Sequence, residues 1–294
     1  MESVIVHVPA TTANLGPGYD CLGVALRLFN RIRVERAPDP YSHSGDNESG
    51  ASIPQVGRAM ADEAAERFFA KAGLLPFSFS WSAEGEVPRS RGMGSSVTVR
   101  LGLLAGLNAL GGEPLERIQL FELCADLEGH PDNAAPAAFG GFTVAGGSEI
   151  ARFEVTEELS FVLLIPDFEV STPEARRVLP PHLERLSSVA SCTNACRITA
   201  AFASQKYSLL RGAFVDGLHQ PFREPLIPFL NEVIAAGERA GALGGFLSGS
   251  GSTICCVTLH DAERVASAMQ GAASGETRTI ITKADNQGFV VRIV

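Results

Sequence analysis

A glycine- and serine-rich stretch directly before a long apolar run is the feature that most constrains how this chain folds. The stretch is Gly92-Met93-Gly94-Ser95-Ser96, and the apolar run extends from Val97 to Leu110. The spacing of the apolar residues predicts a helix over 97–110. Glycines let the backbone turn tightly and approach a ligand, and free N–H groups at a helix N-terminus attract anions. The stretch is therefore either a phosphate site or an ordinary glycine turn with a serine cap.

Two familiar phosphate-binding motifs are absent from the sequence. Lysine occurs only at positions 71, 206 and 283, and none of the three follows a glycine, so there is no G-x-x-x-x-G-K-[ST] loop. The G-x-G-x-x-G pattern fails at its last glycine, because Gly94 is followed by Ser95-Ser96-Val97. Any triphosphate bound here must depend on backbone N–H groups, serine hydroxyls, a metal ion and nearby arginines such as Arg89 or Arg91.

Composition limits the class of protein and its partners. A chain of 294 residues, of which 45% are hydrophobic, suits one large globular domain or, as we prefer, two. The charge of 24 − 33 = −9 argues against a diffuse nucleic-acid-binding face. No secretory signal begins the chain, and no apolar stretch approaches the roughly 20 residues that a membrane span needs. The six cysteines match no zinc spacing. We expect a cytoplasmic protein with reduced thiols, without nucleic-acid or membrane partners.

Turn residues and periodicity divide the chain into alternating elements. Composition changes near 150–158, where we place a boundary between domains 1–153 and 154–294. In the second domain Thr172 is predicted as an N-cap, with Pro173 at the first helical position. The first half is expected to contain strands over 4–8, 24–35 and 77–81, helices over 59–72 and 114–127, and a surface loop over 38–50. The second half is expected to form a small α+β sandwich, with strands over 160–166, 254–259, 278–283 and 288–294 and helices over 188–206, 232–239 and 261–271.

Two polar segments flank these elements. The loop from Pro9 to Asp20 carries Asn14 and Asp20, which suit a small polar ligand with an amine; taken alone, the loop is better explained as a connection with an Asx-turn. The segment 128–136 places His130 after a helix that carries Glu122 eight residues earlier. A carboxylate there and a hydroxyl of the glycine-serine stretch could share Mg²⁺. The alternatives are a solvated glutamate and a buried structural histidine.

Taken in order, these motifs resemble the GHMP kinase superfamily and, within it, the homoserine kinases. The resemblance covers about residues 4 to 258 and implies a two-domain α+β fold. Its N-terminal domain would be like domain 2 of ribosomal protein S5, and its C-terminal domain would be ferredoxin-like. Mild departures are Met93, Val97 and Thr98, where leucine and two alanines are usual, and Ser252-Thr253, where proline precedes Ser or Thr. The motifs that carry the resemblance are residues 9–20, 88–98, 128–133, Thr172-x-x-x-Arg176, 219–223 and 245–253.

The resemblance implies an ATP-dependent kinase that phosphorylates the hydroxyl of L-homoserine on the route to threonine. It also implies a homodimer, and Mg²⁺ held by Ser96 and Glu122. The implied ATP-binding residues are Pro88, Arg91, Gly92, Met93, Gly94, Ser95 and Ser96. The implied homoserine-binding residues are Asn14, Asp20, His130, Arg176 and Arg223. Paired arginines suit a carboxylate and Asp20 suits an ammonium group, so a sugar substrate is disfavoured.

The catalytic step raises one question at Asn133. In relatives such as mevalonate kinase an aspartate base follows the metal-binding glutamate, and the spacing 133 − 122 = 11 places Asn133 at that position. An amide cannot usefully accept a proton. We therefore expect Glu122, Asn133 and Arg176 to act by positioning and charge stabilisation. A kinase for another small alcohol and a catalytically silent sensor are the alternatives, and the intact Glu122, Ser95 and Ser96 argue against the sensor.

Overall fold

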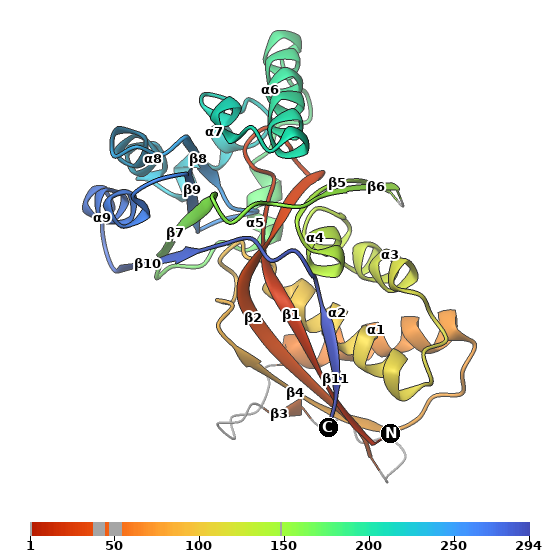
Figure 1. Cartoon of the computed structure of the whole chain (residues 1–294). Helices are drawn as coiled ribbons and strands as arrows, with labels where there is room; N and C mark the ends of the chain where they lie inside the picture. Colours follow the sequence, from red (N-terminus) through yellow and green to blue (C-terminus); the bar gives the residue numbers. More distant parts are fainter. Residues whose placement is uncertain (1, 38–44, 47–54, 148) are drawn as a thin grey trace.

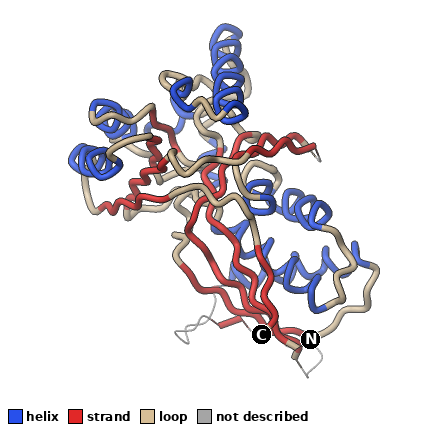
Figure 2. The backbone as a smooth tube through the Cα atoms, in the orientation of Figure 1, coloured by secondary structure: helices blue, strands red, loops and turns tan. Residues whose placement is uncertain are grey.

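The chain folds into two antiparallel-rich sheets, each covered by helices (Figure 1). The computed structural model describes residues 2–37, 45–46, 55–147 and 149–294. The predicted loop 38–50 therefore lies outside the described residues except for 45–46. Figure 2 shows the two longest strands of the first sheet, β1 and β2, extending upward until they lie beside the second domain. Within the described residues no helix combines the length and apolarity needed to cross a membrane.

The first sheet holds seven strands and carries helices on one face. Its main path runs β11-β1-β2-β4-β3, while β5 pairs with β2 and β6 with β5. Helix α2 lies tightly on this sheet, because a Cβ at Gly102 would come within 2.3 Å of Ile32. The strands are β1 (Ser3–Ala13), β2 (Leu22–Arg36), β3 (Gly45–Asp46), β4 (Phe79–Gly85), β5 (Phe142–Gly146), β6 (Glu149–Phe153) and β11 (Val290–Ile293). The helices are α1 (Gln55–Ala72), α2 (Ser95–Leu110), α3 (Arg117–Glu128) and α4 (Ala134–Phe139).

The second sheet is fully antiparallel in the order β10-β7-β9-β8. Helix α8 is the last of the four α-helices between β7 and β8, and α9 connects β9 to β10, so the sheet has the connectivity of a ferredoxin-like sandwich with α5 to α7 inserted after β7. The strands are β7 (Ser160–Pro166), β8 (Gly244–Leu247), β9 (Ile254–Thr258) and β10 (Thr277–Thr282). The helices are α5 (Thr172–Arg177), α6 (Arg185–Ser204), α7 (Gln220–Arg223), α8 (Leu230–Arg239) and α9 (Ala262–Ala272), with single 3₁₀ turns at Tyr207–Leu210 and Glu224–Leu226.

A shared apolar layer joins the two halves. Phe142 of β5 stacks on Phe202 of α6, with ring centroids 4.2 Å apart and ring planes within 6°. Both side chains are buried with Phe161 of β7 and with Leu22 and Val24 of β2 in one cluster. Because these rings come from both halves of the molecule, burial of this layer fixes how the halves meet and where the cleft between them opens.

The predicted two-domain α+β architecture is observed, with differences at the ends of several elements; the strand predicted over 77–81, for example, is β4 at Phe79–Gly85. Strand β1 continues to Ala13, so only residues from Asn14 onward form the predicted loop. Helix α5 begins one residue earlier than predicted, because Ser171 is its N-cap and its hydroxyl accepts the backbone N–H of Glu174. Strand β11 pairs with β1 in the first sheet, although the predicted boundary assigned residues 154–294 to the second domain. This pairing covers the backbone groups along that side of β1.

Candidate active site

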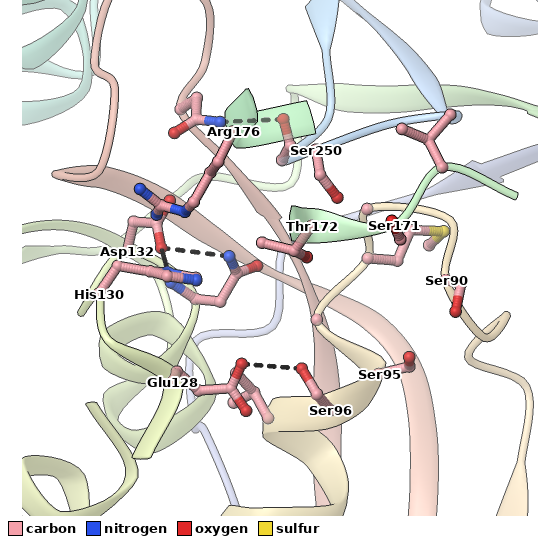
Figure 3. Close-up of a pocket in the computed structure, with 18 of the residues that line it drawn as sticks. Ser90, Ser95, Ser96, Glu128, His130, Asp132, Ser171, Thr172, Arg176 and Ser250 are labelled. Carbon is pink, nitrogen blue, oxygen red and sulfur yellow. Dashed lines mark hydrogen bonds and ion pairs between the residues drawn. The ribbon is translucent and has the colours of Figure 1, made fainter. Parts of the chain in front are cut away.

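A cavity of about 270 Å³ opens where the two halves meet. Figure 3 shows its walls: Ser95 and Ser96 begin α2, Glu128 ends α3, His130 and Asp132 follow α3, and Arg176 projects from α5. The lining residues are Asn14, Asp20, Ser90, Gly92, Met93, Gly94, Ser95, Ser96, Val97, Glu128, His130, Asp132, Asn133, Val170, Ser171, Thr172, Pro173, Arg176, Arg223, Gly249 and Ser250. The fold thus brings together most of the residues that the sequence singled out.

The glycines of the loop before α2 are required by close backbone packing. Gly92 and Gly94 have φ values of 70° and 68°, which side chains rarely tolerate. A Cβ on Gly92 would lie 2.0 Å from the carbonyl oxygen of Ser248, and one on Gly94 would lie 2.2 Å from Thr11 Oγ1. The Ser248 hydroxyl also donates to the carbonyl of Gly92 at 2.7 Å. A second glycine-serine turn, Ser248-Gly249-Ser250-Gly251-Ser252, therefore packs against the first and holds its shape.

The N-terminus of α2 is left open toward the cavity. Its N-cap is Gly94, which has no side chain to accept the N–H groups of the first turn. The serine-cap alternative is therefore not what forms, since Ser95 is already the first helical residue. The first turn of α2 lines the cavity at Ser95 and Ser96, so its free N–H groups and the positive end of the helix dipole lie at the cavity wall. This end of the cavity is suited to phosphate.

The carboxylate that reaches the phosphate end is Glu128, which sequence reasoning had left without a role. The Ser96 hydroxyl donates to Glu128 Oε2 at 2.8 Å, and the Glu128 side chain is only 8% exposed. Glu122 is not among the described residues that line the cavity. It lies six residues earlier on the same helix, which places it about 120° around the axis from Glu128. The spacing of 11 to Asn133 therefore selected a glutamate on another face of α3, and the oxygen donors suited to Mg²⁺ are those of Ser96 and Glu128.

At the other end of the cavity two predicted substrate residues bind each other. Arg176 Nη1 donates to Asp20 Oδ2 at 3.0 Å and Arg176 Nη2 donates to Asp20 Oδ1 at 2.8 Å, which is a paired fork geometry. The same guanidinium donates to the Tyr19 hydroxyl at 2.9 Å. Asn14 shapes this loop, because its side chain accepts the Asp20 N–H and donates to the carbonyl of Gly249. Asn14 thus fixes where Asp20 lies.

His130, Asp132 and Asn133 form one hydrogen-bonded unit. His130 Nδ1 and Asp132 Oδ1 are 2.5 Å apart, and the same oxygen accepts the backbone and side-chain N–H groups of Asn133. Burial alone would lower the pKa of His130, but the hydrogen bond and the charge of Asp132 outweigh it and raise that pKa above its usual value. The Asn133 carbonyl accepts the Thr11 hydroxyl at 2.7 Å. Both ends of the Asn133 amide are therefore engaged, and the side chain is held in place.

Ligand atoms of Asp20, His130 and Asp132 lie within 4.8 Å of one another, a spacing that could also hold a cation. Arg176 already occupies both Asp20 oxygens, and His130 is bonded to Asp132. An ammonium group, which makes several hydrogen bonds to such acceptors, suits this end of the cavity better than a bare metal ion.

Arg223 is held by a buried histidine that sequence reasoning placed in a motif but gave no role. His219 is fully buried; its Nε2 lies 2.8 Å from the Gly16 carbonyl, and Arg223 Nη1 lies 3.1 Å from its Nδ1. Burial lowers the pKa of His219 to about 4, so the neutral ring donates through Nε2 and accepts through Nδ1. Arg223 also donates to the carbonyls of Ala175 and Gly249. These bonds bring a buried guanidinium to the cavity wall.

Two predicted ATP-binding residues face a different space. Pro88 and Arg91 line a second cavity of about 400 Å³ beside β7 and β10. The Arg91 guanidinium donates to the carbonyls of Pro166 and Asp167, at 2.9 and 2.6 Å. Arg91 thus ties the glycine loop to the second sheet. Met93, which was also predicted to bind ATP, is buried, with 1% of the residue exposed.

Comparison with known proteins identifies the family of the chain. The family model for the GHMP kinases N terminal domain matches residues 59–141, and that for GHMP kinases C terminal matches residues 198–274. A homoserine kinase of Moorella thermoacetica is 40% identical over 273 residues, which cover 91% of this chain and 92% of the relative. One from Microchaete diplosiphon is 38% identical over 98% of this chain and 97% of the relative.

A crystal structure of homoserine kinase from Cytophaga hutchinsonii superposes with a TM-score of 0.90, at 24% identity, over 99% of this chain and 98% of that one. At this identity the likeness speaks for the fold, and it confirms the two-domain GHMP architecture. Identity of 38–40% over nearly the full length of curated relatives speaks for the family. The chain therefore belongs to the GHMP kinase superfamily and, within it, to the homoserine kinase family.

Proposed function

We propose that this chain transfers the γ-phosphoryl group of ATP to the side-chain hydroxyl of L-homoserine, producing O-phospho-L-homoserine and ADP. The observation that carries the proposal is that one cavity joins a helix N-terminus open to phosphate to a cluster of charges matched to an amino-acid zwitterion. Family membership supports the same reaction. A cytoplasmic location, a role in threonine biosynthesis and a homodimer are proposed on family membership alone, and sedimentation of the purified chain tests the dimer.

In this proposal the residues from Gly92 to Ser96 hold the ATP phosphates through backbone N–H groups and hydroxyls. Ser96 and Glu128 hold Mg²⁺, because a hydroxyl and a carboxylate at 2.8 Å offer the hard oxygen ligands that this ion prefers. Bound Mg²⁺ neutralises charge on the transferring phosphoryl group. Glu128 replaces Glu122 in this role. Arg91 is left out of the phosphate site because its guanidinium donates to the carbonyls of Pro166 and Asp167 at the end of β7.

L-Homoserine binds at the opposite end of the cavity. Its carboxylate pairs with Arg176 and Arg223, and its ammonium group pairs with Asp20 and Asp132 near His130. The Asp20–Arg176 pair opens to admit the zwitterion, which supplies each residue with a new partner of opposite charge. Since a neutral pair receives a neutral ligand, no net charge is buried. A ligand that lacks either charged group leaves one partner unpaired.

The proposed chemistry uses no carboxylate base at position 133. Asn133 is held by Thr11 and Asp132 and contributes a fixed dipole beside the reacting groups. The hydroxyl proton of homoserine passes to a phosphate oxygen or to water, because a loose phosphoryl-transfer transition state requires little deprotonation of the nucleophile. Catalysis then rests on alignment and charge stabilisation.

The proposal is tested by ADP release with ATP and Mg²⁺ over a panel of alcohols: L-homoserine, L-serine, L-threonine, mevalonate and galactose. Turnover should be strong with L-homoserine and weak with all others. Strong turnover with another alcohol would retain the phosphate site but discard the assigned substrate residues. Tight ligand binding without turnover would show a sensor instead of an enzyme.

The metal assignment is tested by a matched pair of variants on one helix. Glu128→Gln should lower kcat by about 100-fold or more, because it removes a charged ligand of the ion that stabilises the transition state. Glu122→Gln makes the same chemical change on another face of α3 and should keep nearly full turnover. If kcat fell in Glu122→Gln and not in Glu128→Gln, the metal ligand would be Glu122, as its spacing of 11 residues to Asn133 predicted.

A further inference from the structure

Arg100 holds the carboxylate that we assign to the metal. It lies on α2 four residues after Ser96, and therefore on the same face of the helix. Its Nη1 donates to Glu128 Oε1 at 2.9 Å and to the Leu127 carbonyl at 2.6 Å, while its Nη2 donates to Glu63 Oε2 at 3.2 Å. The Arg100 side chain is only 14% exposed. One guanidinium thus joins α1, α2 and the end of α3.

The two oxygens of Glu128 are divided between different partners. Oε1 accepts from Arg100, and Oε2 accepts from the Ser96 hydroxyl. Ser96 and Glu128 line the cavity, whereas Arg100 is not among the described residues that do. Arg100 therefore acts on the site through Glu128 and is a positioning residue. Its bond fixes the rotamer of the carboxylate and leaves one oxygen directed at Ser96.

A purely structural role explains only part of this arrangement. The Leu127 carbonyl belongs to the last turn of α3 and needs a donor, which Arg100 supplies. However, Arg100 Nε is buried without a hydrogen-bond partner among the described residues. Leaving a buried donor unpaired is unfavourable, so the other bonds of the guanidinium must offset this cost. One of them, from Nη1 to Glu128 Oε1, reaches a residue that lines the cavity.

We propose that Arg100 restricts Glu128 to coordination through Oε2 and keeps the affinity of the site for a free divalent cation low, so that the metal enters bound to the nucleotide. This inference rests on the proposed assignment of Glu128 to the metal. A guanidinium one hydrogen bond from the carboxylate offsets its charge and repels a dication in a partly buried site. The phosphates of ATP supply the negative charge that the Arg100–Glu128 pair lacks. Outer partners of this kind control both ligand orientation and metal affinity.

The test measures binding of Mn²⁺ alone, without nucleotide, by electron paramagnetic resonance and calorimetry. Arg100→Gln should bind Mn²⁺ at least about tenfold more tightly than the natural protein, because the nearby positive charge is gone. Arg100→Lys keeps the charge but cannot reach two acceptors as a fork, so its Mn²⁺ affinity should stay low. In both variants kcat should fall about 10- to 100-fold with an unchanged KM for homoserine. Arg33→Gln, which removes an exposed arginine paired with Glu35 on β2, is the matched control and should change neither quantity.

Equal or weaker Mn²⁺ binding by Arg100→Gln would overturn the inference, as would an unchanged kcat in Arg100→Lys. If Arg100→Gln fails to fold, as judged by circular dichroism, the kcat of Arg100→Lys tests the inference: a fall supports it and an unchanged value overturns it. Adding Glu128→Gln to Arg100→Gln should abolish the gain in Mn²⁺ affinity. Full turnover by Glu128→Gln alone would remove the metal assignment and the inference together. An inactive Glu128→Gln beside an unaltered Arg100→Gln would overturn only the inference.

Discussion

The two ends of the cavity are built on opposite principles. At the phosphate end the loop is one continuous stretch, Gly92 to Ser96, whose backbone is held by the second glycine-serine turn, and Glu128 of α3 is its one charged neighbour that we assign a role. The amino-acid end collects charged side chains from four separate segments: Asp20 after β1, Asp132 after α3, Arg176 on α5 and Arg223 on α7. The phosphate end is shaped before any ligand arrives. At the amino-acid end each charge already has a partner: Asp20 and Arg176 pair with each other, Asp132 is bonded to His130, and Arg223 to His219 and two carbonyls.

This difference determines how each end selects its ligand. Oriented N–H groups need no rearrangement to receive phosphate, so the first end provides affinity by preorganisation. At the second end the Asp20–Arg176 ion pair must break before the substrate binds. Only a ligand with both an ammonium group for Asp20 and a carboxylate for Arg176 replaces the lost interaction. Damage at the first end should therefore affect nucleotide binding and stability, and damage at the second end should affect the choice of amino acid.

The largest effect is expected from Arg176→Gln. Removing one partner of a hydrogen-bonded charge pair costs about 2–5 kcal/mol, so kcat/KM for L-homoserine should fall about 100- to 1,000-fold. ATP affinity should change less than about threefold, because Arg176 serves only the amino-acid end. Arg177→Gln, on the same helix but exposed, is the control and should behave like the natural protein. Steady-state kinetics with each substrate varied check both values, and an equal loss of ATP affinity would remove the division between the two ends.

The next effect is a pH dependence confined to the amino-acid end. Burial lowers the pKa of His219 to about 4 from its ordinary 6.5, with the carboxylate of Asp216 acting in the opposite direction and Arg223 in the same one. The unfolded chain takes up this proton below pH 6.5 and the folded chain only near pH 4. The stabilisation is therefore complete above pH 6.5 and is lost as pH falls toward 4, by about 3 kcal/mol in all.

Urea unfolding between pH 7 and pH 4.5 measures this loss. His219→Gln removes the titrating ring, so its free energy of unfolding should vary less with pH over this window than that of the natural protein. The difference between the two curves isolates His219 from carboxylates elsewhere in the chain. Parallel curves would show that His219 does not hold Arg223 through a neutral ring.

The third effect concerns the phosphate end, and compares two glycines with similar backbone. Gly92 and Gly112 have φ values of 70° and 88°, but a Cβ on Gly92 would meet the Ser248 carbonyl at 2.0 Å while one on Gly112 meets nothing within 4 Å. Gly112→Ala should cost about 1 kcal/mol from backbone strain alone. Gly92→Ala should cost about 2 kcal/mol more and lower ATP affinity, because backbone must move. Equal losses in denaturant unfolding would show that the two turns do not press together.

Sequence reasoning anticipated the phosphate end better than the amino-acid end, because the first is local. A glycine-serine stretch before an apolar helix contains its own signal, and α2 and its open N-terminus follow directly. Glu122 was predicted from its spacing to Asn133, but it is not among the described residues that line the cavity. Spacing along the chain does not show that α3 continues to Glu128, directly before the loop that carries His130. The return of β11 to the first sheet depends on strand pairing over nearly the whole chain, which no local pattern records.

Side chains that act through buried bonds were the hardest to predict. Asp132, His219 and Arg100 lie in motifs or on helices that the sequence reveals, but their partners are 2 to 203 residues away along the chain. Asp132 and His219 are almost entirely buried and each is bonded to a group at the cavity wall, and burial is not visible in a single sequence. Periodicity predicts which face of a helix is apolar, but not which polar side chain that face brings to a distant carboxylate.

The smallest effect tests how α5 presents Arg176 to the amino-acid end. Ser171 caps this helix, because its hydroxyl accepts the Glu174 N–H, whereas Thr172, the N-cap expected from sequence, is the first helical residue. Ser171→Ala should cost about 1 kcal/mol in the free energy of unfolding, and Thr172→Ala a few tenths. Because α5 has only six residues, loss of its cap should also raise the KM for L-homoserine slightly and leave the KM for ATP alone. A larger stability loss from Thr172→Ala would return the cap to the position that the sequence indicated, and would shift the start of the helix that carries Arg176 by one residue.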